Sequence, residues 1–318
     1  MYDVTVVGAG VIGLSCAIRL QEAGLRVAVV TADGPDRTTS WVAAAVWYPT
    51  HTAADPRVLR WARATYDTFT EQAGRGVPGV SLRPTRMRLR GSTATPWWAG
   101  ATPDFTLTPD VPPGCTGVWS FTVPAAEMPI YLNWQIQRVA AAGGTLIRRR
   151  LERLDDVADL APVTVNATGL AACHLADDPG VHPARGRIVL VRNPGLTTSI
   201  RDEDHPDGMT YIHPRRQDVV LGGTFEPHQS DLAPDPDAER AIRDRCTALE
   251  PALADAEVFG TAAGLRPVRD GGVRLEADPH NPSLIHAYGH GGAGMTLSWG
   301  CADEVTALVT ALRPGAAA

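Results

Sequence analysis

The hydrophobic pattern near the start of the chain alternates between two kinds of element. Residues 2–7 alternate and then run apolar, as a buried strand does, and residues 25–30 form a second apolar run. Between these runs, apolar side chains recur at helical spacing over residues 14–20, until Gly24 takes the position of a helix C-cap. A strand, a helix and a second strand within about 30 residues predict a nucleotide-binding crossover.

The remainder of the chain predicts further helices and strands in mixed order. Helical patterns, the first opened by an Asp55 N-cap and Pro56, cover residues 55–74, 125–142, 237–249 and 293–312. Strand patterns cover residues 145–147, 163–165, 188–191, 209–212, 219–221, 258–265 and 284–288. Residues 75–123 are rich in Gly, Pro, Thr and Trp and predict short strands and loops. Because segments of the nucleotide-binding type lie at both ends and in the middle, we expect domains that interleave in the sequence.

Composition and charge narrow the class of protein. At 318 residues, with 44% hydrophobic and 20% charged residues, the chain is long enough for two cores of an ordinary globular protein. A net charge of -6 argues against nucleic acid as a partner. The sequence has no apolar run long enough to span a bilayer and does not open on a charged-then-apolar signal segment. We therefore expect a cytoplasmic protein without a membrane partner.

The cysteine and lysine content excludes several kinds of chemistry. The cysteines, 5 in number, are scattered and lack a Cys-x-x-Cys pair, so we expect neither a metal site nor a disulfide framework. Every basic residue is an arginine. A chain without lysine can form neither a pyridoxal phosphate Schiff base nor a Walker-type phosphate loop. Anions must therefore be bound by arginines, backbone amides and helix ends.

A glycine fingerprint follows the first strand. Gly8 permits a tight turn, Gly10 lets the backbone approach a pyrophosphate, and Gly13 lets the helix pack closely on the strand. The phosphates would then lie at the positive end of the helix. In such sites an acidic residue about 20 positions after the glycines binds the ribose hydroxyls, and Asp33, at the end of the second strand, is in that position. Together these features predict a dinucleotide site.

Two later turns of small residues bear on the choice between FAD and NAD, which share that fingerprint. Residues 165–169 (Val-Asn-Ala-Thr-Gly) close a strand and allow a second close approach to a cofactor. Residues 290–294 (His-Gly-Gly-Ala-Gly) open the last helix and direct bare amides and a positive helix end at an electron-rich group. The N1–C2=O edge of a flavin, which gains negative charge on reduction, suits such a site. The alternative is a glycine-rich helix start kept for packing, with His290 as a structural residue.

Further segments extend this pattern through the chain. In order, the segments are Gly8–Ser15, Thr38–Pro49, Val165–Gly169, Tyr211–Pro214, Gly222–Thr224, Gly264–Arg269 and Tyr288–Trp299. Together they resemble the D-amino-acid oxidase family, in which D-aspartate oxidase is a near relative. The resemblance spans almost the whole chain and implies FAD as the cofactor.

The resemblance implies an α/β fold in which a Rossmann-type FAD-binding domain is interleaved with an antiparallel-sheet α+β substrate domain. We assign residues 1–50, 131–185 and 278–318 to the FAD-binding domain. Residues 51–130 and 186–277 form the expected substrate-binding domain.

The resemblance also implies roles for single residues. Arg266 matches the arginine that binds the substrate carboxylate, and the hydroxyl of Tyr211 shares that carboxylate. Gly292 matches the position whose carbonyl accepts a hydrogen bond from the substrate amine. Val46, next to the flavin N5 edge, belongs to the substrate pocket, together with Tyr48 and His213.

A larger set of residues is expected around FAD on the same grounds. It comprises Gly8, Gly10, Val11, Ile12, Gly13, Asp33, Thr38, Thr39, Ala43, Ala44, Ala45, Val46, Val165, Thr168, Gly169, Arg266, His290, Gly291, Gly292, Gly294, Met295 and Thr296.

The activity that the resemblance implies is oxidative deamination of D-amino acids, with neutral or hydrophobic side chains favoured. Hydride passes from Cα to flavin N5, the imino product hydrolyses to a 2-oxo acid and ammonia, and dioxygen is reduced to hydrogen peroxide. Orientation of the substrate, rather than a side-chain base, carries the catalysis.

D-Aspartate oxidase is the first alternative, and it needs a further cation for the side-chain carboxylate. His213, Arg215 and Arg216 are the candidates for that cation, whereas the acidic segment 199–210 argues against acidic substrates. A glycine or sarcosine oxidase and a flavin-binding protein without turnover are remoter alternatives. The preferred substrate, the affinity for FAD, a homodimeric state and gating by residues 199–210 stay open.

Overall fold

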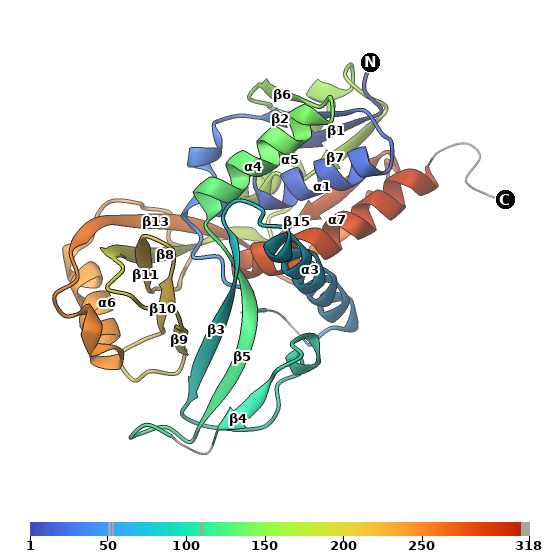
Figure 1. Cartoon of the computed structure of the whole chain (residues 1–318). Coiled ribbons are helices and arrows are strands. Elements are labelled where there is room, and N and C mark those ends of the chain that lie inside the picture. The colour runs from blue at the N-terminus through green and yellow to red at the C-terminus, as the bar shows by residue number, and fades with distance from the viewer. Residues whose placement is uncertain (50–51, 53, 109–110, 313–318) are drawn as a thin grey trace.

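The computed structural model describes residues 1–49, 52, 54–108 and 111–312, and its first layer is a six-stranded sheet (Figure 1). The strand order is β14-β15-β7-β1-β2-β6, and all neighbours are parallel except the pair β14–β15. The strands are β1 Val4–Val7, β2 Val27–Thr31, β6 Thr145–Arg148, β7 Val163–Asn166, β14 Arg274–Ala277 and β15 Leu284–Tyr288. All residues of β1 and β2 are buried, as the central strands of a covered parallel sheet require.

Three of the four long helices, α1 Val11–Glu22, α4 Met128–Ala141 and α7 Gly294–Ala311, lie side by side over one face of this sheet (Figure 1). The fourth, α3 Pro56–Gly74, lies between α7 and strands β3 Val80–Leu89 and β5 Gly117–Ala126. Helix α1 packs between α4 and α7, and α3 packs against α7. Gly300 permits this last contact, because a Cβ atom there would lie 2.3 Å from the Cα of Trp61. As predicted, Asp55 caps α3, its side chain accepting from the Arg57 amide at 2.6 Å.

The second layer is a nine-stranded, mostly antiparallel sheet. Its order is β12-β8-β11-β10-β9-β3-β5-β4, with β13 paired on β8, and β3 and β9 form a parallel pair within it. The strands are β3 Val80–Leu89, β4 Thr106–Thr108, β5 Gly117–Ala126, β8 Val181–Arg192, β9 Ser199–Asp202, β10 Thr210–Pro214, β11 Asp218–Gly222, β12 Glu226–Pro227 and β13 Val258–Arg269. Figure 1 shows β13 running along the antiparallel part, with α6 packed beside the sheet.

The remaining helices are short or peripheral. They are α2 Thr39–Val42, α5 Ala172–Leu175, α6 Pro236–Leu249 and the 3-10 turns Pro35–Arg37, Ala99–Ala101, Leu154–Val157, Gly169–Ala171, Pro251–Leu253 and Gly291–Ala293. Within the described part of the chain, no helix combines the length and the apolar character that a membrane span requires.

Two sequence predictions were wrong in detail. Residues 75–123 contain long strands, since β3 and most of β5 lie there, with 10 residues each. The helix predicted over residues 125–142 begins only at Met128, because Ala125 and Ala126 pair with β3. Small alanines fit a helix pattern equally well, and tertiary pairing overrides that local preference.

The division into two interleaved domains stays a proposal, with one change of boundary. Residues 274–277 form β14, which pairs with β15 in the six-stranded sheet, so they belong with the FAD-binding part rather than with the substrate part. The strand pattern before them, over residues 258–265, gives no hint of this, because pairing between strands is a long-range choice. The proposed boundary between residues 50 and 51 and the last residues, 313–318, lie outside the described residues.

Candidate functional site

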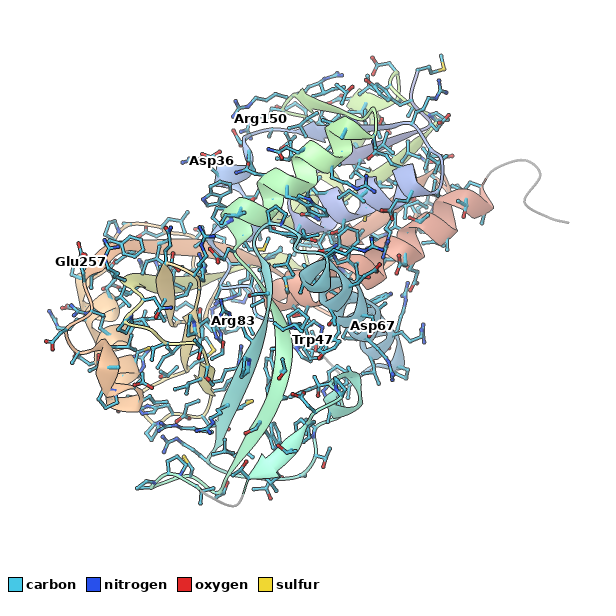
Figure 2. All side chains as sticks on the ribbon, viewed as in Figure 1. Asp36, Trp47, Asp67, Arg83, Arg150 and Glu257 are labelled. Atoms are coloured by element: carbon cyan, nitrogen blue, oxygen red, sulfur yellow. The ribbon has the colours of Figure 1, made fainter. Side chains whose placement is uncertain are left out.

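A cavity of about 950 Å³ has walls from both sheets. It begins beside the carboxyl ends of β1 and β2, where ligands bind in open α/β sheets, and continues to Ile188 and Tyr211 of the antiparallel sheet. Figure 2 shows Asp36 and Arg150, which line its first end, on the part of the molecule that carries α1 and α4. Its volume is near the upper end of the range for small-molecule sites.

The cavity brings together nearly all of the residues predicted around FAD and substrate. The predicted residues that line it are Gly8, Gly10, Val11, Ile12, Asp33, Thr38, Thr39, Ala43, Ala44, Ala45, Val46, Tyr48, Thr168, Gly169, Tyr211, His213, Arg266, His290, Gly291, Gly292, Gly294, Met295 and Thr296. Gly13 and Val165 do not line it. Both lie behind the wall, Gly13 in α1 and Val165 fully buried in β7.

The fingerprint glycines permit backbone contacts that a side chain would block. A Cβ atom on Gly13 would lie 1.9 Å from the Gly8 carbonyl oxygen, and one on Gly8 would lie 2.3 Å from the Ala167 oxygen. Gly8 also has φ +115, which favours glycine. Gly10 is the N-cap of α1 and has no side chain, so the backbone of the first turn lines the cavity directly. This is a cradle for an anion.

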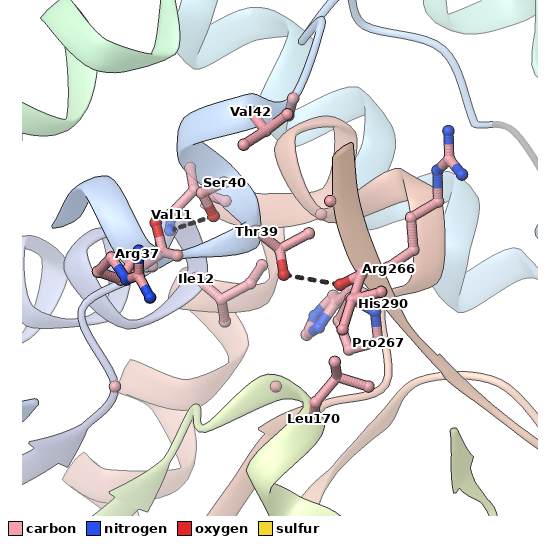
Figure 3. A pocket seen from close by; sticks show the side chains of 18 of the residues that line it. Val11, Ile12, Arg37, Thr39, Ser40, Val42, Leu170, Arg266, Pro267 and His290 are labelled. Carbon is pink, nitrogen blue, oxygen red and sulfur yellow. Dashed lines mark hydrogen bonds between the residues drawn. The ribbon is translucent and has the colours of Figure 1, made fainter. Parts of the chain in front are cut away.

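The segment before α3 ties that cradle to β13 (Figure 3). The Ser40 hydroxyl accepts a hydrogen bond from the Val11 amide at 3.0 Å, and the Thr39 hydroxyl donates to the Leu265 carbonyl at 2.7 Å. Residue 265 directly precedes Arg266. The two hydrogen bonds therefore fix the distance between the start of α1 and the position of Arg266 on β13.

Asp33 lies at the β2 end of the cavity, as predicted. Its Oδ2 accepts from Arg150 Nη2 at 2.9 Å, and about half of its side chain is exposed. Arg149 lines the same end of the cavity. A cofactor ribose at this end would lie beside the Asp33 carboxylate. This carboxylate is held in place by Arg150 and can still accept hydrogen bonds from ribose hydroxyls.

Arg266 is held by backbone carbonyls. Its Nη1 donates to the Thr224 oxygen at 3.0 Å and to the Arg185 oxygen at 3.3 Å. A Cβ atom on Gly186 would lie 2.3 Å from Nη1, so only glycine leaves room for the guanidinium. No ion pair with Arg266 occurs in the part of the chain that the structure describes. An anionic ligand in the cavity would supply the missing counter-charge.

Tyr211 packs into a similar glycine hollow. A Cβ atom on Gly222 would lie 2.0 Å from Tyr211 Cζ, and one on Gly223 would lie 2.8 Å from the hydroxyl oxygen. These close contacts explain why glycine occupies positions 222 and 223. Burial raises the pKa of Tyr211, and the positive charge of Arg266 opposes that rise. The hydroxyl therefore stays protonated and can donate.

Arg201 is a buried, charged residue of the cavity wall that the sequence analysis did not identify. It lies on β9 directly opposite Tyr211 of β10, and only 6% of it is exposed. Its Nη2 pairs with Glu203, and its Nη1 is 3.4 Å from His213 Nε2. Burial and the charge of Arg201 hold the pKa of His213 well below its usual range. His213 is therefore neutral, and Arg201 carries the charge.

The other expected cations do not reach the cavity. Arg215 lies behind its wall, 3.7 Å from Asp218, and Arg216 is exposed. The acidic segment 199–210 also carries less free negative charge than its composition predicts, so it repels an anionic ligand less strongly. Asp202 is fully buried against Arg90 at 2.7 Å, and Glu203 pairs with Arg201. Two of the carboxylates in this segment are therefore paired with arginines and do not stand as free negative charges.

His290 presents an unsatisfied polar atom to the cavity. Only 5% of the residue is exposed, and no described residue pairs with its Nε2 atom. Burial lowers its pKa to about 4, so the ring is neutral near pH 7. A buried polar atom without a partner costs stability, and a polar ligand atom would supply that partner. Together with the glycine cradle, this fits a large, partly anionic cofactor such as FAD.

Comparison with known proteins gives a consistent result. Residues 3–308 match the DAO family model, described as FAD dependent oxidoreductase. The chain is 47% identical over 311 residues to D-amino-acid oxidase of Rubrobacter xylanophilus, with 96% of this chain and 95% of that protein covered. It is 35% identical to human D-aspartate oxidase, with coverages of 96% and 94%. Glycine oxidase from Bacillus cereus shares the fold, with a TM-score of 0.82 at 22% identity over 99% of this chain and 96% of that chain.

Proposed function

This chain belongs to the family of FAD-dependent oxidoreductases, and we propose that it oxidatively deaminates neutral D-amino acids to 2-oxo acids and ammonia. The observation that carries the proposal is the position of Arg266. Its guanidinium has no acidic partner among the described residues and lines the same cavity as the glycine cradle and Tyr211. A relative that is 47% identical bears the name D-amino-acid oxidase.

In this proposal, different residues of the cavity bind different groups of the substrate. The Arg266 fork binds a carboxylate in two parallel hydrogen bonds, and the protonated Tyr211 hydroxyl donates to it. The Gly292 carbonyl is the proposed acceptor for the amine. The apolar wall at Val46 and Ile188 suits a side chain without charge. When bound, FAD supplies the acceptor for a hydride. The protein's part is orientation and exclusion of water.

D-Aspartate oxidation is the second candidate, and one observation favours it. Arg201 is a buried cation in the cavity wall, where a side-chain carboxylate could pair with it. Glu203 already neutralises that charge, so an acidic substrate must compete with an internal carboxylate. This competition is the reason we place neutral substrates first.

Dioxygen as the electron acceptor, with hydrogen peroxide as product, is part of the proposal. Cytoplasmic localisation and a homodimeric assembly are further proposals. The peroxide is measured with a coupled peroxidase assay, and the assembly by light scattering of the purified protein. Oxidised D-amino acid without peroxide would assign the electrons to another acceptor.

The decisive experiment is the visible spectrum of the purified protein under anaerobic conditions. D-Valine, D-alanine, D-methionine and D-aspartate are added in separate cuvettes, with L-valine as control. Flavin bands that bleach with neutral D-amino acids and return with air support the proposal. Bleaching by D-aspartate alone would promote the second candidate. Bands that no amino acid bleaches would refute both.

A further inference from the structure

A chain of hydrogen bonds runs from the loop after β14 to the wall of the cavity. Asp278 Oδ2 lies 3.1 Å from His286 Nε2, and His286 Nδ1 lies 3.3 Å from Asn166 Nδ2. Asn166 Oδ1 accepts from the Thr168 amide at 3.2 Å and from the Thr168 hydroxyl at 2.7 Å. His286 and Asn166 face each other on the parallel strands β15 and β7, and Thr168 lines the cavity.

The ionised carboxylate of Asp278 determines which group donates in each hydrogen bond of this chain. Asp278 also accepts from the amides of His280 and Asn281, both at 2.9 Å. The hydrogen bond from His286 leads these interactions in lowering the pKa of Asp278 to about 2, so its carboxylate is ionised and only accepts. His286 must therefore donate through Nε2, and Nδ1 of its neutral ring must accept. The amide of Asn166 then donates to His286, which leaves its oxygen for Thr168.

The surroundings keep His286 neutral. Only 1% of the residue is exposed, and burial lowers its pKa, aided by the positive charge of Arg274 and opposed by Asp278 and Glu276. The groups that face the ring are Asp278, Glu276, Arg274, Tyr288 and Asn166. A second proton on Nδ1 would set two donors against each other, His286 N–H and the Asn166 amide.

We propose that Asp278, His286 and Asn166 are positioning residues for the cofactor, acting through the turn at residues 167–169. The neutral tautomer of His286 orients Asn166, and Asn166 holds Thr168 and Gly169 against the cavity. The same turn supports the glycine cradle, because the Ala167 oxygen leaves no space for a Cβ atom on Gly8. We call the hydrogen bonds that link Asp278, His286, Asn166 and Thr168 the relay. Loss of the relay therefore loosens both walls of the cofactor site. The proposal concerns FAD retention and does not depend on which substrate is oxidised.

The Asn166→Asp substitution tests the relay by inverting its polarity. An aspartate at this position can accept from Thr168 with one oxygen, but its second oxygen needs a donor. His286 supplies that donor only when doubly protonated, between two carboxylates. In the wild type, FAD affinity should change little between pH 8 and pH 6.5, because burial lowers the pKa of His286 and the neutral ring keeps the hydrogen bonds intact. In the variant, affinity should instead fall as the pH rises.

FAD binding to the apoprotein is followed by quenching of flavin fluorescence across this pH range. His280→Gln is the matched control, an exposed histidine whose side chain is outside the relay, and it should keep the wild-type profile. A wild-type profile in Asn166→Asp would overturn the proposal. The measurement uses no substrate, so it is independent of the anaerobic bleaching test.

The tautomer of His286 provides a second readout if the variant fails to fold. Histidine-labelled wild-type protein is examined by nitrogen NMR at pH 7.5, and the signal is assigned by its loss in His286→Gln. We expect the neutral ring protonated at Nε2. A ring protonated at Nδ1, or a doubly protonated ring, would refute the relay whatever the variant does.

Discussion

The guanidinium carbon of Arg201 lies 4.1 Å from the centroid of the Tyr48 ring, so a buried cation stacks on an aromatic face in the cavity wall. Such a contact in a desolvated site contributes about 2 kcal/mol. Burial raises the pKa of Tyr48, and the Coulomb effect of Glu203 acts in the same direction. The Arg201 charge is therefore held in place by Tyr48 on one side and by Glu203 on the other, and we expect Glu203 to limit pairing of Arg201 with an anionic substrate.

The first prediction concerns Glu203→Gln. Removing the internal carboxylate leaves Arg201 free to pair with a substrate, so kcat/KM for D-aspartate relative to D-valine should rise about tenfold, equivalent to about 1.4 kcal/mol. Steady-state oxygen consumption with both substrates measures the ratio. Glu257→Gln is the matched control, because that glutamate pairs with Arg192 on the exposed surface. An Arg201→Met/Glu203→Gln double variant should lose the gain. An unchanged ratio in the single variant would exclude Arg201 from substrate selection.

The second prediction concerns Arg266. Arg266→Ala should lower kcat/KM for D-valine, with a loss of transition-state stabilisation of about 2–5 kcal/mol. The reason is that the substrate carboxylate loses its partner in a desolvated site. Arg266→Lys should recover only part of this loss, since a lysine keeps the charge and lacks the fork. Arg86→Ala, an exposed position on β3, is the control. Equal activity of the alanine and lysine variants would point to a steric role rather than to carboxylate binding.

The crossover of β1, α1 and β2 could be predicted because its determinants are local. The apolar runs, the helical spacing and the glycine positions all lie within residues 2–30, and each imposes the same element. The cofactor cradle follows from the same residues. Most of the residues expected around FAD lie outside this segment and follow from the family resemblance, and nearly all of them line one cavity.

The role of Arg201 could not be predicted, because it depends on distant pairing. Segment 199–202 reads as a short polar loop, and only its pairing with β10 and β3 turns Arg201 toward the cavity. The partner that buries the neighbouring Asp202 is Arg90, 112 residues away in sequence. Composition correctly counts these acidic residues, but it carries no information on which of them are neutralised.

The third prediction concerns Gly13, which lies behind the cavity wall. Gly13→Ala places a methyl group against the Gly8 oxygen, at 1.9 Å before any relaxation, so the first turn of α1 must shift. We expect overpacking to destabilise the protein by about 1–3 kcal/mol, and FAD to bind more weakly. Urea unfolding of the apoprotein and FAD titration measure the two effects. Gly74→Ala is the control, since a Cβ atom there has no neighbour within 4 Å. A Gly13→Ala protein with wild-type FAD affinity would contradict the proposal that the glycine turn and the start of α1 hold the cofactor.

The last prediction concerns the pH dependence that His290 imposes on the apoprotein. Burial lowers its pKa from 6.5 to about 4 in the folded state, so folding favours the neutral ring. The associated stability is present above pH 6.5 and is lost as the pH falls toward 4. Since one pKa unit corresponds to about 1.4 kcal/mol, the wild type should lose about 2 kcal/mol from this group between pH 8 and pH 5.

The His290→Gln variant isolates that contribution, because glutamine is polar and does not titrate. The free energy of unfolding is measured in urea at pH 8 and pH 5 for both proteins without FAD. The buried His213 and His286 are common to both, so their contributions cancel in the comparison. The wild type should lose about 2 kcal/mol more than the variant over this interval. Equal losses would mean that His290 is already solvated in the apoprotein, and that the cavity wall closes around it only when a ligand binds.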